Sequence, residues 1–429
     1  MDGLVYPDRT VHTGLLEYKN VYRPARVISY DKESGELVLH NYMDFDDLKD
    51  YVKISYELTQ DGLVISKGKL PEVSAAPHSE GKINLKINVP ESGKCYLKFI
   101  YHLKKELPLL DEDHILGFDE IEVSQKDAKC QLAEKWVEKT VTDSELQVSE
   151  DDTQIHIKGR EFAYTIDRRT ALFTEMKFAG REYLNHPMEL NIWRAPTDND
   201  MYIKSEWKKA HYDKAYTRAY TTEVVQGKHG VKITSHASVV AETVQKILDV
   251  TITWKIEAAG KIDADIAVTK DDEFPDLPRF GVRMFLDKKL SAARYFGMGP
   301  QESYCDKHQA ASHGLYHANV DDLHEDYIRP QENGSHYDCE YVELNNSRYG
   351  IVVSAENAFS FNASYYTQEE LEKKTHNYEL TESDSVVFCV DYALNGIGSN
   401  SCGPVVLEQY RFDDVLFRFQ FTLIPYIKG

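Results

Sequence analysis

The sequence predicts an all-β protein in which one β-sandwich is followed by a second, larger antiparallel sandwich. Apolar and polar residues alternate along many short segments, among them Lys82–Val89 and Cys95–His102, so one face of each strand points inward. In the first third of the chain, turn-forming residues separate these segments at roughly ten-residue spacing, the rhythm of an antiparallel sandwich. Helical patterns are few and are predicted over Lys204–His211 and Thr367–Thr375, the latter with Thr367 as N-cap.

The strand pattern is interrupted once, which divides the chain into regions. Alternation over residues 15–125 predicts one β-sandwich, and a charged stretch over residues 126–150 predicts a connection. Alternation then continues without a clear break, so residues 151–429 are predicted to form one large domain. Residues 1–14 look like the end of a preceding folding unit, because a short apolar segment such as Leu4–Tyr6 cannot bury itself alone; a disordered leader is the alternative.

Composition excludes two classes of partner. Fifty basic and seventy-one acidic residues give a net charge of -21, which repels nucleic acid and anionic membrane surfaces. No apolar run approaches the roughly 18 residues of a membrane span, and the start has no signal-peptide pattern, so we expect a cytoplasmic protein. Six cysteines are scattered singly, which predicts free and mostly buried thiols.

Two loops stand out as candidate binding sites. Ala195–Asp200 places two carboxylates, an amide and a hydroxyl close together after an aromatic segment, which suits sugar hydroxyls or a cation. The same residue types also cap turns by bonding their own backbone, so a structural role is equally open. Asn395–Pro404 contains three glycines, which allow the backbone to approach a ligand closely, although the loop can also be a long turn.

Other polar segments are less informative. Ile328–Gly334 is a polar turn in which Arg329 and Glu332 can pair with each other or bind a polyol. The 16 histidines show no metal-site spacing. Carboxylates are numerous, but nothing in the sequence singles out the pair that a glycosidase requires, so no mechanism follows from the residues alone.

In order and over nearly the whole length, these segments resemble the C-terminal part of the β-galactosidases of glycoside hydrolase family 2. The motifs that carry this resemblance are Asp2–Thr10, Leu16–Pro24, Trp193–Asp200, Gly297–Tyr304, Tyr327–Gly334 and Gly396–Pro404. The resemblance implies that residues 1–14 are the exit from a catalytic barrel. It further implies an immunoglobulin-like linking sandwich over 15–125 and a galactose mutarotase-like supersandwich over 151–429.

In that family the acid/base and nucleophile glutamates lie on barrel strands upstream of everything present here. The resemblance therefore implies a noncatalytic portion, inactive alone, of an enzyme that hydrolyses terminal β-D-galactosides such as lactose with retention. Its implied partners are the β-galactoside substrate, the upstream catalytic barrel and, in the intact enzyme, further copies of the same chain. The implied cofactors of the intact enzyme are Na⁺ and Mg²⁺.

The resemblance also implies contacts at the rim of the active site. Asp2 matches a position that contacts the galactosyl group and helps to hold a sodium ion. Asp198, Asn199, Asp200 and Met201 match a mobile loop near the substrate. Cys402 falls where some members place a tryptophan that stacks on the leaving sugar and others place cysteine, which puts a strong stacking platform in doubt.

Two alternatives remain open at this point. A freestanding carbohydrate-binding module would use the polar loops and the many tyrosines as a lectin-like face. A mutarotase-like enzyme would need a histidine and a glutamate that converge on a sugar ring, and no spacing nominates such a pair. The start at the barrel's last motif fits an excised fragment better than a natural small subunit.

Overall fold

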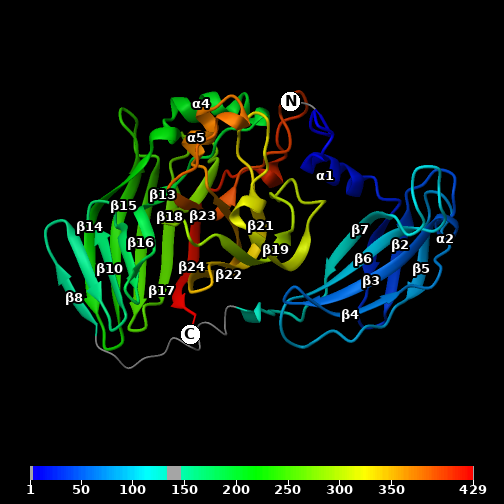
Figure 1. The fold of residues 1–429 in the computed structure, drawn as a ribbon, viewed down its shortest axis with the longest axis horizontal. Helices are drawn as coiled ribbons and strands as arrows, with labels where there is room; N and C mark the ends of the chain where they lie inside the picture. The colour runs from blue at the N-terminus through cyan, green and yellow to red at the C-terminus, as the bar shows by residue number, and fades with distance from the viewer. Residues whose placement is uncertain (1–2, 133–145, 429) are drawn as a thin grey trace. The chain divides into compact units, whose positions relative to one another are not determined.

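The computed structural model describes residues 3–132 and 146–428 (Figure 1). The described residues form two compact units. Of the described residues, the smaller unit comprises 3–131 and 308–316, and the larger unit comprises 132, 146–307 and 317–428. Strands dominate both units, which confirms the predicted all-β class. The predicted connection over 126–150 lies partly outside the described residues, and the predicted domain boundaries stay predictions.

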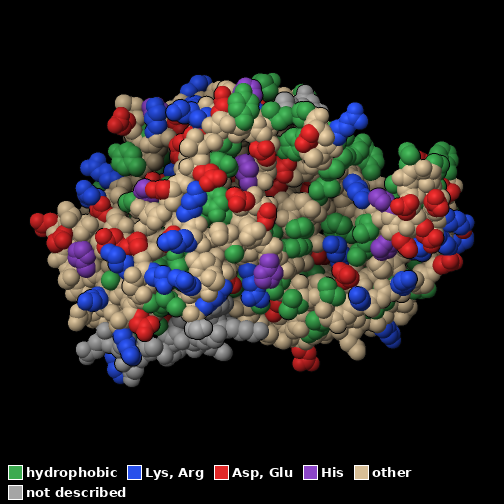
Figure 2. Space-filling model, in the orientation of Figure 1, with side chains coloured by type: hydrophobic (Ala, Val, Ile, Leu, Met, Phe, Trp, Pro, Cys, Tyr) green, Lys and Arg blue, Asp and Glu red, His purple; other side chains and the backbone are tan. Residues whose placement is uncertain are grey.

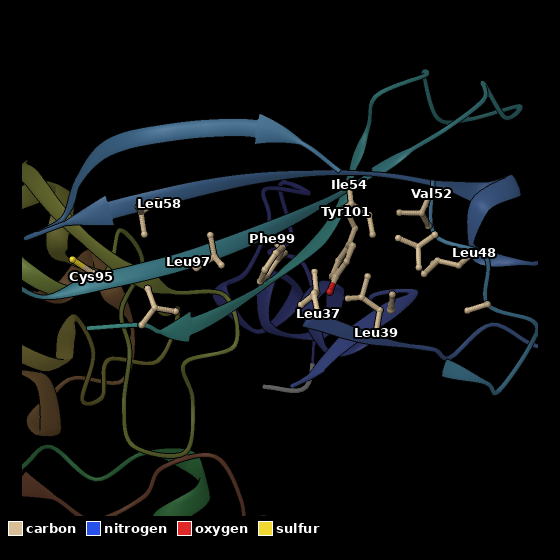
Figure 3. Close-up of a cluster of buried hydrophobic side chains, with 14 residues drawn as sticks. Leu37, Leu39, Leu48, Val52, Ile54, Leu58, Cys95, Leu97, Phe99 and Tyr101 are labelled. Atoms are coloured by element: carbon tan, nitrogen blue, oxygen red, sulfur yellow. The ribbon is translucent and has the colours of Figure 1, made fainter. Parts of the chain in front are cut away.

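The smaller unit is a sandwich of two antiparallel sheets with the strand orders β1-β2-β5 and β4-β3-β6-β7. Its core contains inward side chains from both sheets, including Leu37 and Leu39 of one and Leu97, Phe99 and Tyr101 of the other (Figure 3). The period-two alternation produces this core because every second residue of each strand faces the opposite sheet. The strands are β1 (Ala25–Tyr30), β2 (Glu36–Asn41), β3 (Val52–Gln60), β4 (Leu63–Lys69), β5 (Glu80–Asn84), β6 (Cys95–Leu103) and β7 (Ile115–Glu122), and the helices are α1 (Thr13–Val21) and α2 (Leu48–Tyr51).

Residues 308–316 belong to the smaller unit although the chain on both sides belongs to the larger one. The Glu17 carboxylate on α1 accepts the backbone N–H groups of Gln309 and Ala310, both at 2.8 Å. His313 stacks on Tyr96, with ring centroids 4.0 Å apart. Helix α1 was not predicted from the sequence. It is stabilised by tertiary contacts, such as those of Glu17 with the segment 308–316.

The predicted strand Lys82–Val89 is only half right. Strand β5 ends at Asn84, which pairs with Glu36, the first residue of β2, and a further backbone bond follows, from the Leu85 N–H to the Gly35 carbonyl at 2.7 Å. Leu85, Ile87 and Val89 still pack against the core. The alternation therefore predicted the buried side chains correctly over all of Lys82–Val89, but it predicted the strand pairing correctly only as far as Asn84.

The larger unit contains a five-stranded sheet, ordered β12-β11-β10-β9-β8, and a twelve-stranded antiparallel sheet. The main path of the large sheet runs β13-β18-β23-β22-β24-β17-β16-β15-β14, and β19, β20 and β21 branch from it. The bounds of the small sheet are β8 (Gln147–Glu150), β9 (Gln154–Lys158), β10 (Phe162–Asp167), β11 (Leu172–Phe178) and β12 (Arg181–Glu182). Those of the large sheet are β13 (Leu184–Asn191), β14 (Tyr216–Gln226), β15 (Gly230–Val240), β16 (Leu248–Glu257), β17 (Ile262–Lys270), β18 (Arg279–Asp287), β19 (Ala292–Gly299), β20 (Ser312–Asn319), β21 (Ser335–Asn345), β22 (Tyr349–Ser364), β23 (Ser385–Leu394) and β24 (Leu416–Ile427). Strand β20 begins within the segment 308–316 that belongs to the smaller unit.

The two sheets of the larger unit share an aromatic core. Phe173 meets Trp254 edge to face at 4.9 Å between ring centroids, and the Trp254 indole N–H donates to the Ala171 carbonyl at 2.8 Å. Both predicted helices of this unit are confirmed, as α4 (Ile203–Lys209) and α5 (Gln368–Lys373). The Thr367 hydroxyl caps α5 by accepting the Glu370 backbone N–H at 3.1 Å.

The surface mixes both signs of charge. Acidic and basic side chains are interspersed over the face shown in Figure 2. Among the described residues, no helix is long and apolar enough to cross a membrane. All six cysteines are free, and four of them are buried, as predicted.

Candidate functional site

The site is built from segments that the sequence had singled out separately. The chain leaves strand β13 at Asn191 and enters Trp193–Asp200, which ends in a single 3₁₀ turn over Asp198–Asp200. The segment Asn395–Gly398 follows strand β23 directly. The two segments follow strands β13 and β23. Because both strands pair with β18, these distant parts of the sequence lie together.

Arg194 joins the two loops. Its guanidinium is fully buried and donates to both carboxylate oxygens of Asp200, at 2.7 and 3.2 Å. It also donates to the carbonyls of Asn395 and Gly396. The Asp200 carboxylate accepts a further bond from the Thr197 backbone N–H at 2.8 Å, which closes the turn. Asp200 is therefore a structural partner of Arg194.

The Asp306 carboxylate holds the Asn395–Gly398 loop by hydrogen bonds to its backbone. One oxygen of this carboxylate accepts the Ile397 backbone N–H at 3.0 Å and the other accepts that of Gly398 at 2.7 Å. Asn199 donates its side-chain amide to the Ile397 carbonyl at 2.7 Å. A Cβ added at Gly396 would lie 2.6 Å from the Asp306 carboxylate, so the close approach requires glycine.

A second buried arginine lies deeper in the larger unit. Arg279 donates to both oxygens of Asp391, at 2.6 and 3.1 Å, and to Glu332 at 3.3 Å. Burial raises the pKa of both carboxyl groups, against the opposing effect of Arg279. The alternative in which Glu332 pairs with Arg329 is wrong, because Glu332 turns inward to Arg279 while Arg329 lies 3.7 Å from Asp198.

Glu302 is a third buried carboxylate, from the motif Gly297–Tyr304. It accepts bonds from the Lys307 ammonium at 2.5 Å, from the Tyr327 hydroxyl and from the Gly334 backbone N–H at 2.8 Å. Burial alone would raise the pKa of Glu302, but Lys307 and these hydrogen bonds hold it below its ordinary value. Glu302 thus ties two motifs together and stays ionised.

The predicted site residues fall into different environments. Asp198 is partly exposed, and its backbone N–H donates to the side-chain oxygen of Gln331 at 3.0 Å. Met201 is 42 % exposed, and Cys402 is also exposed. Asp2 lies outside the described residues. The structure therefore joins Asn199 directly, and Asp200 through Arg194, to the Asn395–Gly398 loop, while Asp198 lies beside Gln331 and Arg329. Contacts of these residues with substrate stay predictions.

Sequence reasoning missed Asp306, which holds the Asn395–Gly398 loop, and the buried pair of Arg279 and Asp391. Each lies far along the chain from its partners, so no local spacing indicates the pairing. The only indication in the sequence was the pair Gly396 and Gly398, which predicts that the backbone approaches another group closely. The glycines do not identify that group as Asp306.

The geometry limits the chemistry of these loops. Asp200 is buried and engaged by Arg194, and Asp306 is half-buried and engaged by two backbone N–H groups, so among the described residues Asp198 is the one of these three loop carboxylates whose oxygens hold no loop backbone. Within residues 3–132 and 146–428, no group of three or more His, Cys, Asp or Glu side chains could hold a metal ion. The site can therefore contribute hydrogen bonds and shape to a ligand.

Comparison with known proteins identifies the family of this chain. The family model described as beta galactosidase small chain matches residues 158–423, and the model for beta-galactosidase domain 4 matches residues 37–124. A beta-galactosidase from Actinobacillus pleuropneumoniae is 44% identical over 99% of this chain, and one from Staphylococcus xylosus is 31% identical over 99%. This chain covers 41% and 42% of the lengths of those two proteins.

The chain belongs to the beta galactosidase small chain family. It spans about two-fifths of the curated relatives that it matches. Among solved structures, a galactose 1-epimerase from Lactobacillus acidophilus NCFM is similar with a TM-score of 0.38 and 7% sequence identity, covering 67% of this chain and 100% of that one.

Proposed function

We propose that this chain is the noncatalytic C-terminal portion of an enzyme that hydrolyses terminal β-D-galactosides, such as lactose, with retention. The observation that carries the proposal is the match of 99% of this chain to about two-fifths of beta-galactosidases. The engagement of Asp200 and Asp306 in holding loops supports it, because neither carboxylate is available as a nucleophile or a proton donor.

The upstream catalytic portion of the same enzyme is the proposed partner, and the β-galactoside is the proposed ligand of the completed site. In this proposal Asp198, Asn199, Met201 and Cys402 line the rim of that site. Their full or partial exposure, on two loops that Arg194 joins, supports such a role. The free thiols support a reducing, cytoplasmic location, and the intact enzyme is proposed to be a homo-oligomer.

The ions follow from the same resemblance. We propose that Na⁺ and Mg²⁺ serve the intact enzyme, with Asp2 as a sodium ligand. A carboxylate oxygen is the kind of donor that both hard cations prefer. When bound, Na⁺ would supply positive charge beside the galactosyl hydroxyls.

The test is hydrolysis of a chromogenic β-galactoside by the purified chain, alone and mixed with a separately produced upstream portion. The proposal expects no hydrolysis by the chain alone and hydrolysis on mixing. Rim contacts would appear in the mixed enzyme as a change in KM when Asp198 is replaced by Ala.

A further inference from the structure

The larger unit contains a pocket that none of the loops described above accounts for. Its volume is about 320 Å³, at the small end of the roughly 300–1,000 Å³ typical of small-molecule sites. Its lining includes Tyr337, Phe359, Tyr392, Tyr410 and Asp414. We name it the Tyr392 pocket.

The floor of the Tyr392 pocket is rigid and aromatic. Tyr392 stacks on Phe417, with centroids 4.8 Å apart and an interplanar angle of 16°. Phe359 on β22 is 2% exposed, and Tyr304 packs with Leu394 in a buried cluster. Tyr337, Tyr392 and Tyr410 of the lining are partly exposed, so their rings offer apolar surfaces to a ligand.

Three strands depart from regular pairing where they border the pocket. On β23, Tyr392 has no partner on β18, because the pairing passes from Ala393 directly to Asp391. On β21 the register shifts on both sides of Cys339, and Asp338 has φ 53°, a left-handed conformation uncommon outside glycine. On β22, the strand pairing with β21 passes from Ser354 to Phe359. Such bulges re-aim side chains and are concentrated near functional sites.

The pocket also presents polar groups that the protein itself does not use. Within the described residues, the side chains of Tyr392, Gln409, Tyr410 and Asp414 make no hydrogen bond. Burial is the main cause that raises the pKa of the Asp414 carboxyl, and the charge of Asp413 raises it further. A cation paired with Asp414 would lower that pKa instead. These donors and acceptors are left for a ligand.

The lining selects the chemical class of that ligand. Asp338 and Asp414 oppose an anion, and Arg411 opposes a cation. A wholly apolar ligand would cover hydroxyls, an amide and a carboxylate without replacing their bonds to water. An uncharged ring with several hydroxyl groups satisfies both the aromatic faces and the polar groups. We propose that the Tyr392 pocket binds one monosaccharide.

The experiment is isothermal titration calorimetry of the full chain with D-galactose, with D-glucose and, as a cationic probe, with choline. We expect at least one hexose to bind, and we expect Asp414→Ala to weaken it about tenfold or more, as for loss of a hydrogen bond to a charged group. Asp413→Ala is the matched control, because it removes the same charge one position away from the lining. It should change the affinity by less than about twofold.

Two further variants locate the binding. Ala358→Trp fills the pocket from an exposed position and should abolish hexose binding. Asp198→Ala, in the other loop, should leave it unchanged. Absence of heat with both hexoses, binding of choline alone, or equal weakening by the Asp413 and Asp414 variants would overturn the proposal. Since no hydrolysis is measured, these outcomes leave the proposed β-galactosidase role untouched.

Discussion

Asp198 and Asp200 lie two positions apart in one motif, yet their surroundings differ completely. Asp200 is 4% exposed and is bound to the fully buried Arg194, whereas Asp198 is partly exposed, 3.7 Å from a solvent-facing Arg329. A buried charge that loses its partner is costly, while an exposed ion pair contributes little. The same residue type therefore serves folding at one position and is available for binding at the other.

Replacing Asp200 by Ala should destabilise the larger unit by about 3–5 kcal/mol, because Arg194 would remain buried without its carboxylate. Asp198→Ala is the control and should cost less than about 1 kcal/mol. Tryptophan fluorescence during denaturant unfolding reports on this unit, since Trp193, Trp207 and Trp254 are buried in it. Equal losses from the two variants would contradict the assigned roles.

His336 makes the stability of the larger unit dependent on pH. Burial lowers the pKa of His336 from 6.5 to about 4, so between these values the unfolded chain binds more protons than the folded one. The neutral ring therefore stabilises the fold fully above pH 6.5, and this contribution is lost as the pH falls towards 4. At roughly 1.4 kcal/mol per pKa unit, the loss amounts to about 3 kcal/mol.

His336→Phe tests this dependence, because phenylalanine keeps a ring against Tyr295 and Phe361. The free energy of unfolding of both forms is measured between pH 4 and 7. The variant should lose less stability on acidification than the unmodified chain, by up to about 3 kcal/mol. A difference between the two forms that stays constant with pH would show that His336 does not titrate in this way.

The sequence located these residues but not their partners. The motifs around Asp198, Glu332 and Gly396 were identified from local composition, which depends only on neighbours along the chain. The pairing of Arg279 with Asp391 joins positions on two strands, β18 and β23, separated by more than a hundred residues. Such pairs depend on sheet order, and period-two alternation does not specify which strands are neighbours.

The features that period-two alternation could not predict lie mostly in loops and at the ends of strands. Alternation gave the buried faces of both sandwiches, and it also marked Leu85, Ile87 and Val89 as partly buried where β5 had already ended. Helix α1 escaped prediction because its stability comes from contacts such as those of Glu17 with Gln309 and Ala310, not from an apolar stripe.

The loop after β23 depends on the close approach of Gly396 to Asp306. Gly396→Ala would place a Cβ 2.6 Å from that carboxylate and should destabilise the larger unit by about 1–3 kcal/mol. Gly403→Ala is the matched control in the same loop, since nothing lies within 4 Å of its Cβ, and it should cost less than about 0.5 kcal/mol. Thermal unfolding and hydrogen exchange at Ile397 and Gly398 check both. Unchanged protection in Gly396→Ala would mean that Asp306 does not fix the loop.

The chain as a whole is a pair of β-rich units that matches about two-fifths of each beta-galactosidase compared with it. The fold class followed from the sequence because period-two alternation recurs on both sides of the 126–150 interruption. Contacts of the rim residues with substrate do not follow from the chain alone, because the proposed catalytic groups belong to another part of the enzyme.

Hydrolysis of a chromogenic β-galactoside, assayed with this chain alone, with the upstream portion alone and with the two mixed, tests the proposed role most directly. We expect both portions to be inactive when separate and activity to appear on mixing, with a dependence on the concentration of this chain that saturates. Hydrolysis by this chain unaided would contradict the proposal and would place a catalytic carboxylate pair within its 429 residues.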